Sequence, residues 1–177
     1  MVDDISRIAR LVRNIPDFPK PGVQFKDITP LLGSASGFKA AVAAMLAGVP
    51  EDIDMVAGIE SRGFVFGVPM AQALGVGFVP LRKPGKLPGP VYEESFDLEY
   101  GSSTLAMHTD ALRAGQRVLI VDDLLASGGT AVAAAHLVSR AGAELVHISV
   151  LIELADLGGR ALLAKNGLVD VSSVLVY

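Results

Sequence analysis

Residues 118–130 read VLIVDDLLASGGT, and the interpretation of the whole chain starts from this stretch. Its run of apolar residues predicts a strand that is buried on both faces and ends in two aspartates. Small residues follow and open an alanine-rich segment over 130–141, which has the composition of a helix. A buried strand, a short loop and a helix in that order form the repeating unit of an α/β fold.

The rest of the chain continues this alternation. A first, amphipathic helix must end before Pro16, because the residue before proline avoids helical backbone angles. Ser36 is placed to cap the next helix. Helices are predicted over 37–48, 64–74 and 156–166, strands over 55–59, 77–81, 117–121, 147–154 and 170–177, and a hairpin around Gly101 and Ser102. We therefore expect an α/β fold with a central, mainly parallel sheet, helices on both faces, and one domain over 1–177.

The composition restricts the class of protein. With 177 residues, 51% of them hydrophobic, the chain can form one domain with a sizeable core. A net charge of −4 argues against a surface for duplex nucleic acid, and the lack of cysteine excludes disulfides and thiolate zinc sites. The uncharged run at 63–81 is broken by glycines and prolines, which favours a buried helix and strand over a membrane span. The N-terminus has no signal-peptide pattern, so we expect a cytoplasmic protein with no membrane and no nucleic-acid partner.

The loop that follows the 117–121 strand and its two aspartates has the features of an anion site. Ligands of open α/β sheets bind beyond the carboxyl ends of the strands, where the start of a helix offers unpaired N–H groups. Small side chains let a phosphate approach the backbone, and two hydroxyls add donors. The residues are Ala126, Ser127, Gly128, Gly129 and Thr130. The segment is neither a Walker A loop nor a dinucleotide GxGxxG motif.

The adjacent Asp122 and Asp123 narrow the ligand further. Ionised carboxylates only accept hydrogen bonds, and they repel a phosphate unless a neutral or cationic group lies between. A ribose diol supplies two hydroxyl donors, and a positively charged sugar centre fits better still. The stretch therefore predicts a site for a ribose 5-phosphate.

The 118–130 stretch resembles the phosphoribosyl-pyrophosphate (PRPP) motif of the type I phosphoribosyltransferases. Further blocks resemble the adenine phosphoribosyltransferases of that family: FPKPGVQFKDITP at 18–30, GIESRGF at 58–64, RKPGKLPGP at 82–90 and LEYG at 98–101. These blocks follow the family's order and cover most of the chain. The resemblance implies the type I phosphoribosyltransferase fold, with a small N-terminal hood within 1–35, a flexible catalytic loop and hairpin at 82–107, and a homodimer.

The resemblance also implies the reaction. The family transfers the 5-phosphoribosyl group from PRPP to adenine, giving AMP and pyrophosphate, through a transition state with positive charge on the sugar. Asp122 and Asp123 would hold the ribose hydroxyls, and residues 126–130 the 5′-phosphate. Because neighbouring side chains of a strand point to opposite faces, both aspartates reach one ligand only if the strand has ended at Asp122.

Pyrophosphate is expected at two other blocks. Ser61 and Arg62 would bind it just past a strand end, since the guanidinium fork matches phosphate oxygens. The family suggests a strained peptide bond near Glu60-Ser61, and the sequence leaves open whether that bond is cis. The basic residues implied as further pyrophosphate contacts are Arg82, Lys83 and Lys86, with the first of them reaching across a dimer interface.

Glu99 and Tyr100 fall on the loop that the family closes over its site to exclude water. Glu99 would handle the proton on adenine, and Tyr100 would order the closed loop. With Arg62 at the leaving group, these are the catalytic residues that the resemblance implies.

Adenine presents an exocyclic N–H donor beside the N1 acceptor. In an extended segment the C=O of Gln24 and the N–H of Lys26 face the same side and match that edge. A 6-oxopurine reverses both polarities and leaves two groups unpaired, at about 1–3 kcal/mol each. Phe25 and Leu124 would sandwich the ring.

Mg²⁺ is the expected cofactor, and it would be carried mainly by pyrophosphate oxygens and water, so no protein cage for it is predicted. The histidines show no ligand spacing and are predicted to be structural; they are His108, His136 and His147.

Three alternatives remain open from the sequence. The same chemistry could act on another purine such as xanthine. A regulator could bind PRPP without turnover, although the single N-terminal helix leaves no room for a helix-turn-helix. A generic nucleotide-binding α/β module is disfavoured by the basic loop and the 18–30 block.

Overall fold

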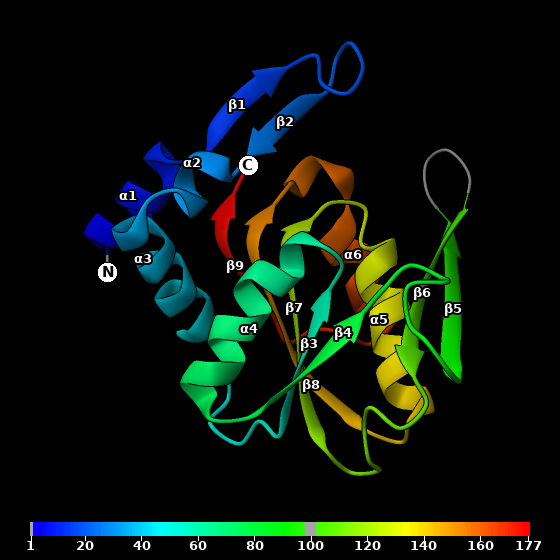
Figure 1. Ribbon diagram of the computed structural model, residues 1–177. Coiled ribbons are helices and arrows are strands. Elements are labelled where there is room, and N and C mark those ends of the chain that lie inside the picture. The colour runs from blue at the N-terminus through cyan, green and yellow to red at the C-terminus, as the bar shows by residue number, and fades with distance from the viewer. Residues whose placement is uncertain (1, 98–101) are drawn as a thin grey trace.

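Five parallel strands form the central sheet of the computed structural model, which describes residues 2–97 and 102–177 (Figure 1). In spatial order they are β4 (Gly77–Leu81), β3 (Met55–Ile59), β7 (Arg117–Leu125), β8 (Glu144–Glu153) and β9 (Val171–Val176). Strand β7 lies at the centre, so its apolar run is buried on both faces. The parallel pairing confirms the expected sheet and brings all the carboxyl ends to one edge.

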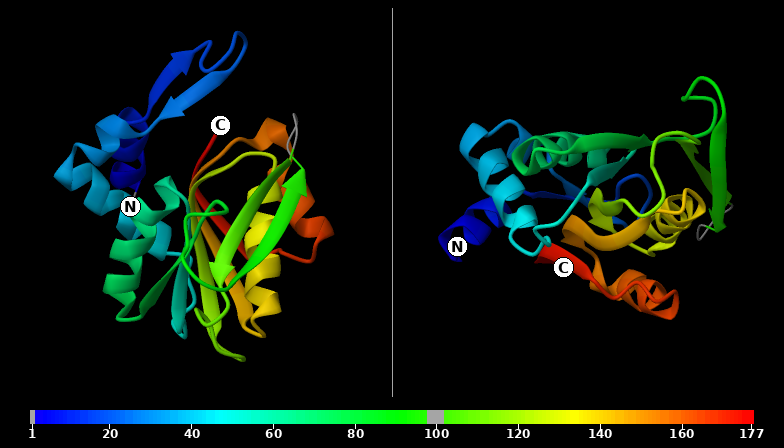
Figure 2. Two further views of the ribbon diagram at one scale, coloured as in Figure 1. Left: turned by 45° about the vertical axis from the view of Figure 1, so that its right-hand side comes forward. Right: turned by 90° about the horizontal axis from the view of Figure 1, so that it is seen from below.

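Helices cover both faces of this sheet (Figure 1 and Figure 2). One face carries α1 (Val2–Arg10), α3 (Ala35–Leu46) and α4 (Arg62–Leu74), with α2 (Thr29–Leu32) against α3. The other carries α5 (Gly129–Arg140) and α6 (Gly159–Lys165), which follows the short 3₁₀ helix η1 (Ala155–Leu157). Alternate residues of β7 serve the two layers, because Leu119 and Val121 join the core under α4 while Val118 and Ile120 join the core under α5.

The uncharged run at 63–81 folds as predicted into a helix and a strand, α4 and β4. Buried Phe66 and Met70 pack the inner face of α4 into the core. No helix within 2–97 or 102–177 is long and apolar enough to cross a membrane.

The predicted hairpin is present as β5 (Val91–Asp97) and β6 (Ser102–His108), which pair antiparallel and pack on α5. Arg140 donates a hydrogen bond to the carbonyl of Glu93 at 2.7 Å, which joins α5 to β5. The predicted catalytic residues Glu99 and Tyr100 lie outside the described residues.

An antiparallel ribbon of β1 (Arg13–Pro16) and β2 (Gln24–Asp27) stands beyond the carboxyl edge of the sheet, where the hood is expected (Figure 1). In the turn between the two strands the Phe18-Pro19 peptide is cis, and Asp17 accepts a hydrogen bond from the N–H of Gly22 at 2.7 Å. The ammonium of Lys26 lies 4.0 Å from the centre of the Tyr177 ring, which ties the ribbon to the end of the chain beyond β9.

The expected cap of the second long helix is wrong by two residues. Helix α3 begins at Ala35, and Ser34 is its N-cap, with its hydroxyl accepting from the N–H of Gly37 at 3.2 Å. Ser36 lies inside the first turn. Both serines precede an apolar segment, so cap preference alone does not choose between them. Gly37 lies so close to Leu11, the residue that follows α1, that an added Cβ would meet its side chain, so this part of the chain packs directly on the first turn of α3.

Asp27 anchors the hood where β2 meets α2. Its carboxylate accepts hydrogen bonds from Arg13 Nη2 at 2.6 Å and from the N–H of Thr29 at 2.9 Å. The Thr29 amide, and next the Arg13 guanidinium, lower the pKa of Asp27 to about 2.

We expect Asp27→Asn to destabilise the protein at neutral pH and to lose this effect in acid. A carboxyl whose folded pKa is depressed adds stability above its unfolded pKa, here 3.8, and the addition disappears as the pH falls toward about 2. Urea unfolding of both proteins from about pH 6 to about pH 2.5 measures the difference in unfolding free energy. A difference that does not change with pH would show that shape, rather than charge, anchors the hood.

Candidate active site

A cleft of about 340 Å³ opens at the carboxyl edge of the sheet. Strand β3 ends at Ile59 and pairs with β7 only as far as Val121, whereas β7 continues to Leu125 with β8 beside it. The missing neighbour leaves room for a ligand beside the end of β7, where open α/β sheets bind their ligands. The predicted residues that line this cleft are Ser61, Arg62, Asp122, Asp123, Leu124, Ala126, Ser127, Gly128 and Thr130.

The paired aspartates lie at the centre of the cleft. The condition that β7 has ended at Asp122 is wrong, because the strand runs on to Leu125. Both residues nevertheless line the cleft, since β3 no longer covers this part of the strand edge. The Asp122 carboxylate accepts the N–H of Asp123 at 2.8 Å and lies beside Gly63, where an added Cβ would come within 3.1 Å of its Oδ1. Glycine at position 63 therefore keeps open the space that the Asp122 carboxylate fills.

Burial dominates the electrostatics of this pair. It raises the pKa of Asp122 well above the usual range, and the neighbouring Asp123 carboxylate raises it further. Burial also raises the pKa of Asp123, against the opposing effect of the Arg62 guanidinium. Two acids held in this way favour a cationic ligand or a hydroxyl donor between them.

The predicted phosphate loop joins β7 to α5. Gly128 has φ +88°, a left-handed conformation that favours glycine, and it caps the helix that starts at Gly129. The first N–H groups of α5 have no partner within the helix, and Ser127 and Thr130 line the cleft at this point. Ser127 is exposed and Thr130 is half-buried, while Gly129 is buried and, unlike its neighbours in the loop, does not line the cleft. This arrangement is suited to a phosphate monoester.

Ser61 and Arg62 come from the turn between β3 and α4. The Glu60-Ser61 peptide is cis, which answers the question that the sequence leaves open. The Nε of Arg62 lies 3.0 Å from an Asp123 oxygen, and its guanidinium is 5.6 Å from the centre of the Phe25 ring. Arg62 therefore connects the aspartate pair with the hood.

The basic block at 82–86 borders the cleft but does not line it. Arg82 donates to the Glu60 carboxylate through Nε at 3.2 Å and Nη2 at 3.1 Å, and the N–H of Lys83 adds a third bond at 2.9 Å. These contacts lower the pKa of Glu60, with the Arg82 hydrogen bond as the largest cause. The predicted contacts Arg82, Lys83 and Lys86 are thus gathered around an acid that the sequence analysis does not single out.

The residues predicted to recognise adenine are divided between two elements. Leu124 lines the cleft, whereas Gln24, Phe25 and Lys26 belong to β2 of the hood. Pro16 lies opposite Gln24 and has no N–H, so this pair cannot exchange two hydrogen bonds. Hydrogen-bonded and non-hydrogen-bonded residue pairs alternate along an antiparallel ribbon, which favours Ile15–Phe25 as a hydrogen-bonded pair. Gln24 and Lys26 then belong to the non-hydrogen-bonded pairs, so the Gln24 C=O and the Lys26 N–H face away from β1.

Sequence reasoning missed the apolar floor of the cleft. The cleft is also lined by four apolar side chains, from Ile59, Ile120, Ile148 and Val150. Their positions on the neighbouring parallel strands β3, β7 and β8 are the signal in the sequence that could have found them. No group of three or more acidic or histidine side chains that could hold a metal ion occurs in the described part of the chain. His147 bonds Ser172 at 2.8 Å and His136 lies 3.1 Å from Glu94, while His108 Nε2 is buried without a partner.

The fold and this cleft define a phosphoribosyltransferase of type I architecture. A model of the family "Phosphoribosyl transferase domain" matches residues 32–171. The chain is similar to the adenine phosphoribosyltransferase of Cutibacterium acnes, with 57% identity over 168 residues and 95% of each chain covered.

Solved structures agree in fold over the full length. The adenine phosphoribosyltransferase of Rhodothermus marinus shares 47% identity with a TM-score of 0.93, and all of both chains is covered. That of Saccharomyces cerevisiae, complexed with adenine and an imino-altritol bisphosphate, shares 36% identity with a TM-score of 0.90 and covers 99% of this chain and 100% of its own. The chain belongs to the adenine phosphoribosyltransferase family.

Proposed function

We propose that this protein transfers the 5-phosphoribosyl group of PRPP to N9 of adenine, giving AMP and pyrophosphate. The observation that carries this function is one cleft in which two aspartates, the start of α5 and Arg62 meet. The yeast relative was solved with adenine, which supports adenine as the base here.

Different residues of the cleft would bind different parts of the substrates. The N–H groups at the start of α5 and the Ser127 and Thr130 hydroxyls would bind the 5′-phosphate. The Asp122 and Asp123 carboxylates would bind the ribose hydroxyls and stabilise the positive charge that grows on the sugar. Pyrophosphate leaves with the electron pair of its bond to C1′, and the Arg62 fork would bind the growing negative charge. Adenine N9 forms the new bond and gives up its proton.

The remaining roles stay predictions of the same proposal. Glu99 would handle the adenine proton, and Tyr100 would order the closed loop. The Arg82, Lys83 and Lys86 block would bind pyrophosphate once Glu60 releases it. We further propose a cytoplasmic homodimer, in which Arg82 reaches the partner's site.

Mg²⁺ would enter with the pyrophosphate of PRPP, whose oxygens and waters suit this ion. When bound, it would neutralise part of the charge on the leaving group. The hard carboxylate oxygens of Asp122 and Asp123 suit the waters of such an ion.

The direct test supplies the purified protein with PRPP, Mg²⁺ and one base at a time. Adenine should give AMP faster than hypoxanthine, guanine or xanthine gives its nucleotide. AMP formed no faster than IMP would contradict the assignment of the base. Binding of PRPP without any turnover would instead indicate a regulator.

Lys26→Ala should leave the preference for adenine unchanged, because the backbone of β2 reads the base. The Lys26 ammonium is already engaged with Asn14 Oδ1 at 3.3 Å and with the Tyr177 ring. The measurement is the ratio of kcat/KM for adenine to that for hypoxanthine. Phe25→Ala is the matched comparison and should raise KM for adenine. If Lys26→Ala removed most of the preference for adenine over hypoxanthine, the ammonium rather than the backbone would be what recognises the purine.

A further inference from the structure

We propose that Glu153 and Arg160 are positioning residues for the PRPP phosphate: they hold the start of α6, and α6 holds the loop at 126–128. This inference rests on the proposed function and adds to it two residues outside the cleft that affect how PRPP binds.

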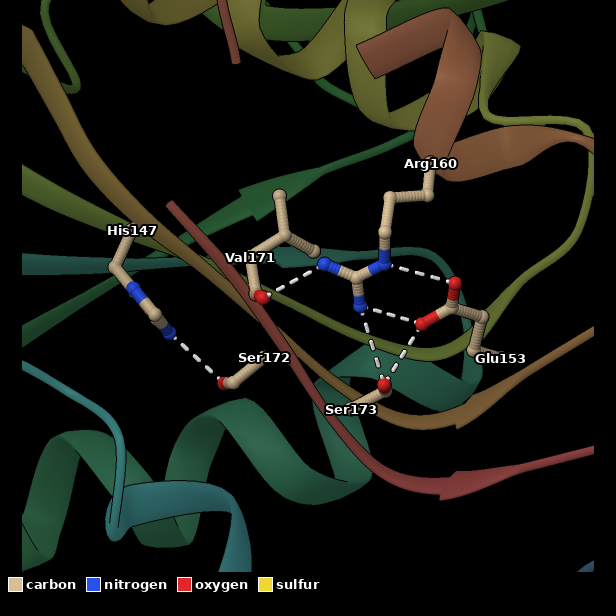
Figure 3. Close-up of polar contacts among 6 residues, drawn as sticks. All are labelled: His147, Glu153, Arg160, Val171, Ser172 and Ser173. Atoms are coloured by element: carbon tan, nitrogen blue, oxygen red, sulfur yellow. Dashed lines mark hydrogen bonds and ion pairs between the residues drawn. The ribbon is translucent and has the colours of Figure 1, made fainter. Parts of the chain in front are cut away.

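An ion pair joins the end of β8 to α6 (Figure 3). The Arg160 guanidinium donates to both Glu153 oxygens, through Nε at 2.9 Å and Nη2 at 2.5 Å. Ser173 donates to the same carboxylate at 2.7 Å, and Arg160 also donates to the carbonyl of Val171 at 3.0 Å. A two-pronged pair with these further bonds fixes both the position and the rotation of the Arg160 side chain.

Glu153 is buried, with 6% of its surface exposed, so the presence of a charged residue here needs an explanation. The Arg160 hydrogen bond, with the smaller help of Ser173, lowers the pKa of Glu153, so the carboxylate is charged at neutral pH. Burying a charge costs desolvation, and such pairs are often no better for stability than apolar residues of the same volume. A gain in stability therefore does not explain why a charged pair is buried here. A need to hold the backbone of α6 in one position does explain it.

The residue before Arg160 touches the phosphate loop directly. A Cβ added to Gly159 would lie 2.2 Å from the carbonyl oxygen of Ala126, and one added to Gly128 would lie 2.8 Å from the carbonyl oxygen of Gly159. The two backbones are thus in contact from both sides, with no side chain between them. A shift of the first turn of α6 would remove the support under the loop.

Backbone hydrogen bonds make the same connection between the strand ends. The N–H of Leu154, next to Glu153, donates to the carbonyl of Leu125 at 2.9 Å, at the point where β7 enters the phosphate loop. The N–H of Tyr177 donates to the carbonyl of Glu153 at 2.9 Å. Glu153 therefore sits where β7, β8 and the end of the chain after β9 are tied together, beside the phosphate loop.

The opposite edge of the sheet offers a matched control. Arg117 begins β7 and donates to Glu144 Oε1 at 3.2 Å and to the carbonyl of Asp52 at 3.0 Å. It has the same ion-pair chemistry as Arg160 but lies at the amino end of the strand, away from the cleft.

The experiment compares Arg160→Ala with Arg117→Ala by steady-state kinetics and thermal unfolding. Arg160→Ala should raise KM for PRPP by about tenfold while KM for adenine stays within about twofold, the size expected for a residue that acts through a neighbour. Arg117→Ala should lower the melting temperature without changing KM for PRPP. Equal rises of both KM values in Arg160→Ala, or the same kinetic change in Arg117→Ala, would overturn the proposal.

Two further variants make the outcome independent of the folding of Arg160→Ala. Glu153→Gln keeps the shape of the side chain and removes the charge, and it should show the same PRPP-specific defect. Gly159→Ala leaves the ion pair intact but crowds Ala126, so it should also raise KM for PRPP alone. An unchanged KM for PRPP in both variants would overturn the proposal.

Calorimetric binding of ribose 5-phosphate separates this proposal from the assignment of the reaction. Weaker binding in Arg160→Ala than in the parent protein supports the positioning role, whether or not adenine is turned over. Equal binding contradicts it. Absence of turnover in the parent protein would count against the proposed function alone.

Discussion

Asp122→Asn should lower kcat by on the order of 10²-fold, the scale for losing one preorganised electrostatic group, without lowering thermal stability. Asparagine keeps the shape of the side chain beside Gly63 but cannot balance positive charge on the sugar. Burial and the Asp123 carboxylate raise the pKa of Asp122, so its ionised form costs folding free energy at neutral pH. Removing that charge should leave the melting temperature equal or higher.

The measurement pairs kcat with a melting curve at several pH values. A raised folded pKa means that the parent protein gains stability as the pH falls through that pKa toward the unfolded value of 3.8, and this gain should shrink in Asp122→Asn. Asp52→Asn serves as the control, because Asp52 pairs with Arg117 far from the cleft and its loss should not change kcat. An active Asp122→Asn enzyme would remove Asp122 from the ribose site.

Arg62→Ala should reduce kcat/KM for PRPP by on the order of 10²-fold or more. Two effects combine, since the leaving pyrophosphate loses a guanidinium and the buried Asp123 loses the cation 3.0 Å away. Without that cation the pKa of Asp123 should rise further, because Arg62 is the largest of the effects that oppose burial there. The residual activity should therefore recover partly as the pH is raised.

The pH profile of kcat/KM for PRPP distinguishes these effects. Arg62→Lys keeps the positive charge but lacks the two-pronged guanidinium. This variant should regain the parent's pH dependence of kcat/KM for PRPP, while the value of kcat/KM should stay reduced. Arg7→Ala is the control, as Arg7 is an exposed residue of α1, 3.8 Å from Asp4. Parent-like rates in a folded Arg62→Ala enzyme would exclude Arg62 from the pyrophosphate site.

Contiguous features of this protein were predictable from the sequence. The phosphate loop takes its chemistry from neighbours in the chain, 126–130, so its pattern is visible without a fold. The buried strands are continuous apolar runs, and the parallel sheet follows from their alternation with helices. The start of α3 was not predictable in this way, because Ser34 and Ser36 are equal candidates by cap preference, and the packing of Leu11 on Gly37 is made only in the folded chain.

The expectation for the aspartates rests on the alternation of side chains between the two faces of a strand, and β7 runs on past them to Leu125. Both residues line the cleft, and β3 stops pairing at Val121, which leaves the following residues of β7 without a neighbour on that edge. The role of Glu60 was missed because its partner Arg82 is distant in sequence and becomes adjacent only when β3 and β4 pair.

The sequence by itself determined the α/β class, the family, and the local chemistry of the loop after β7. Only the tertiary structure decided that Arg62 faces Asp123, that Glu60 holds Arg82, and that Glu153 and Arg160 stand behind the phosphate loop. Local patterns depend on residues within one helix or strand. The pairs Arg62–Asp123 and Glu60–Arg82 join residues that are far apart in the chain, and Glu153–Arg160 joins the end of a strand to the following helix. All three depend on where the strands end along one edge of the sheet.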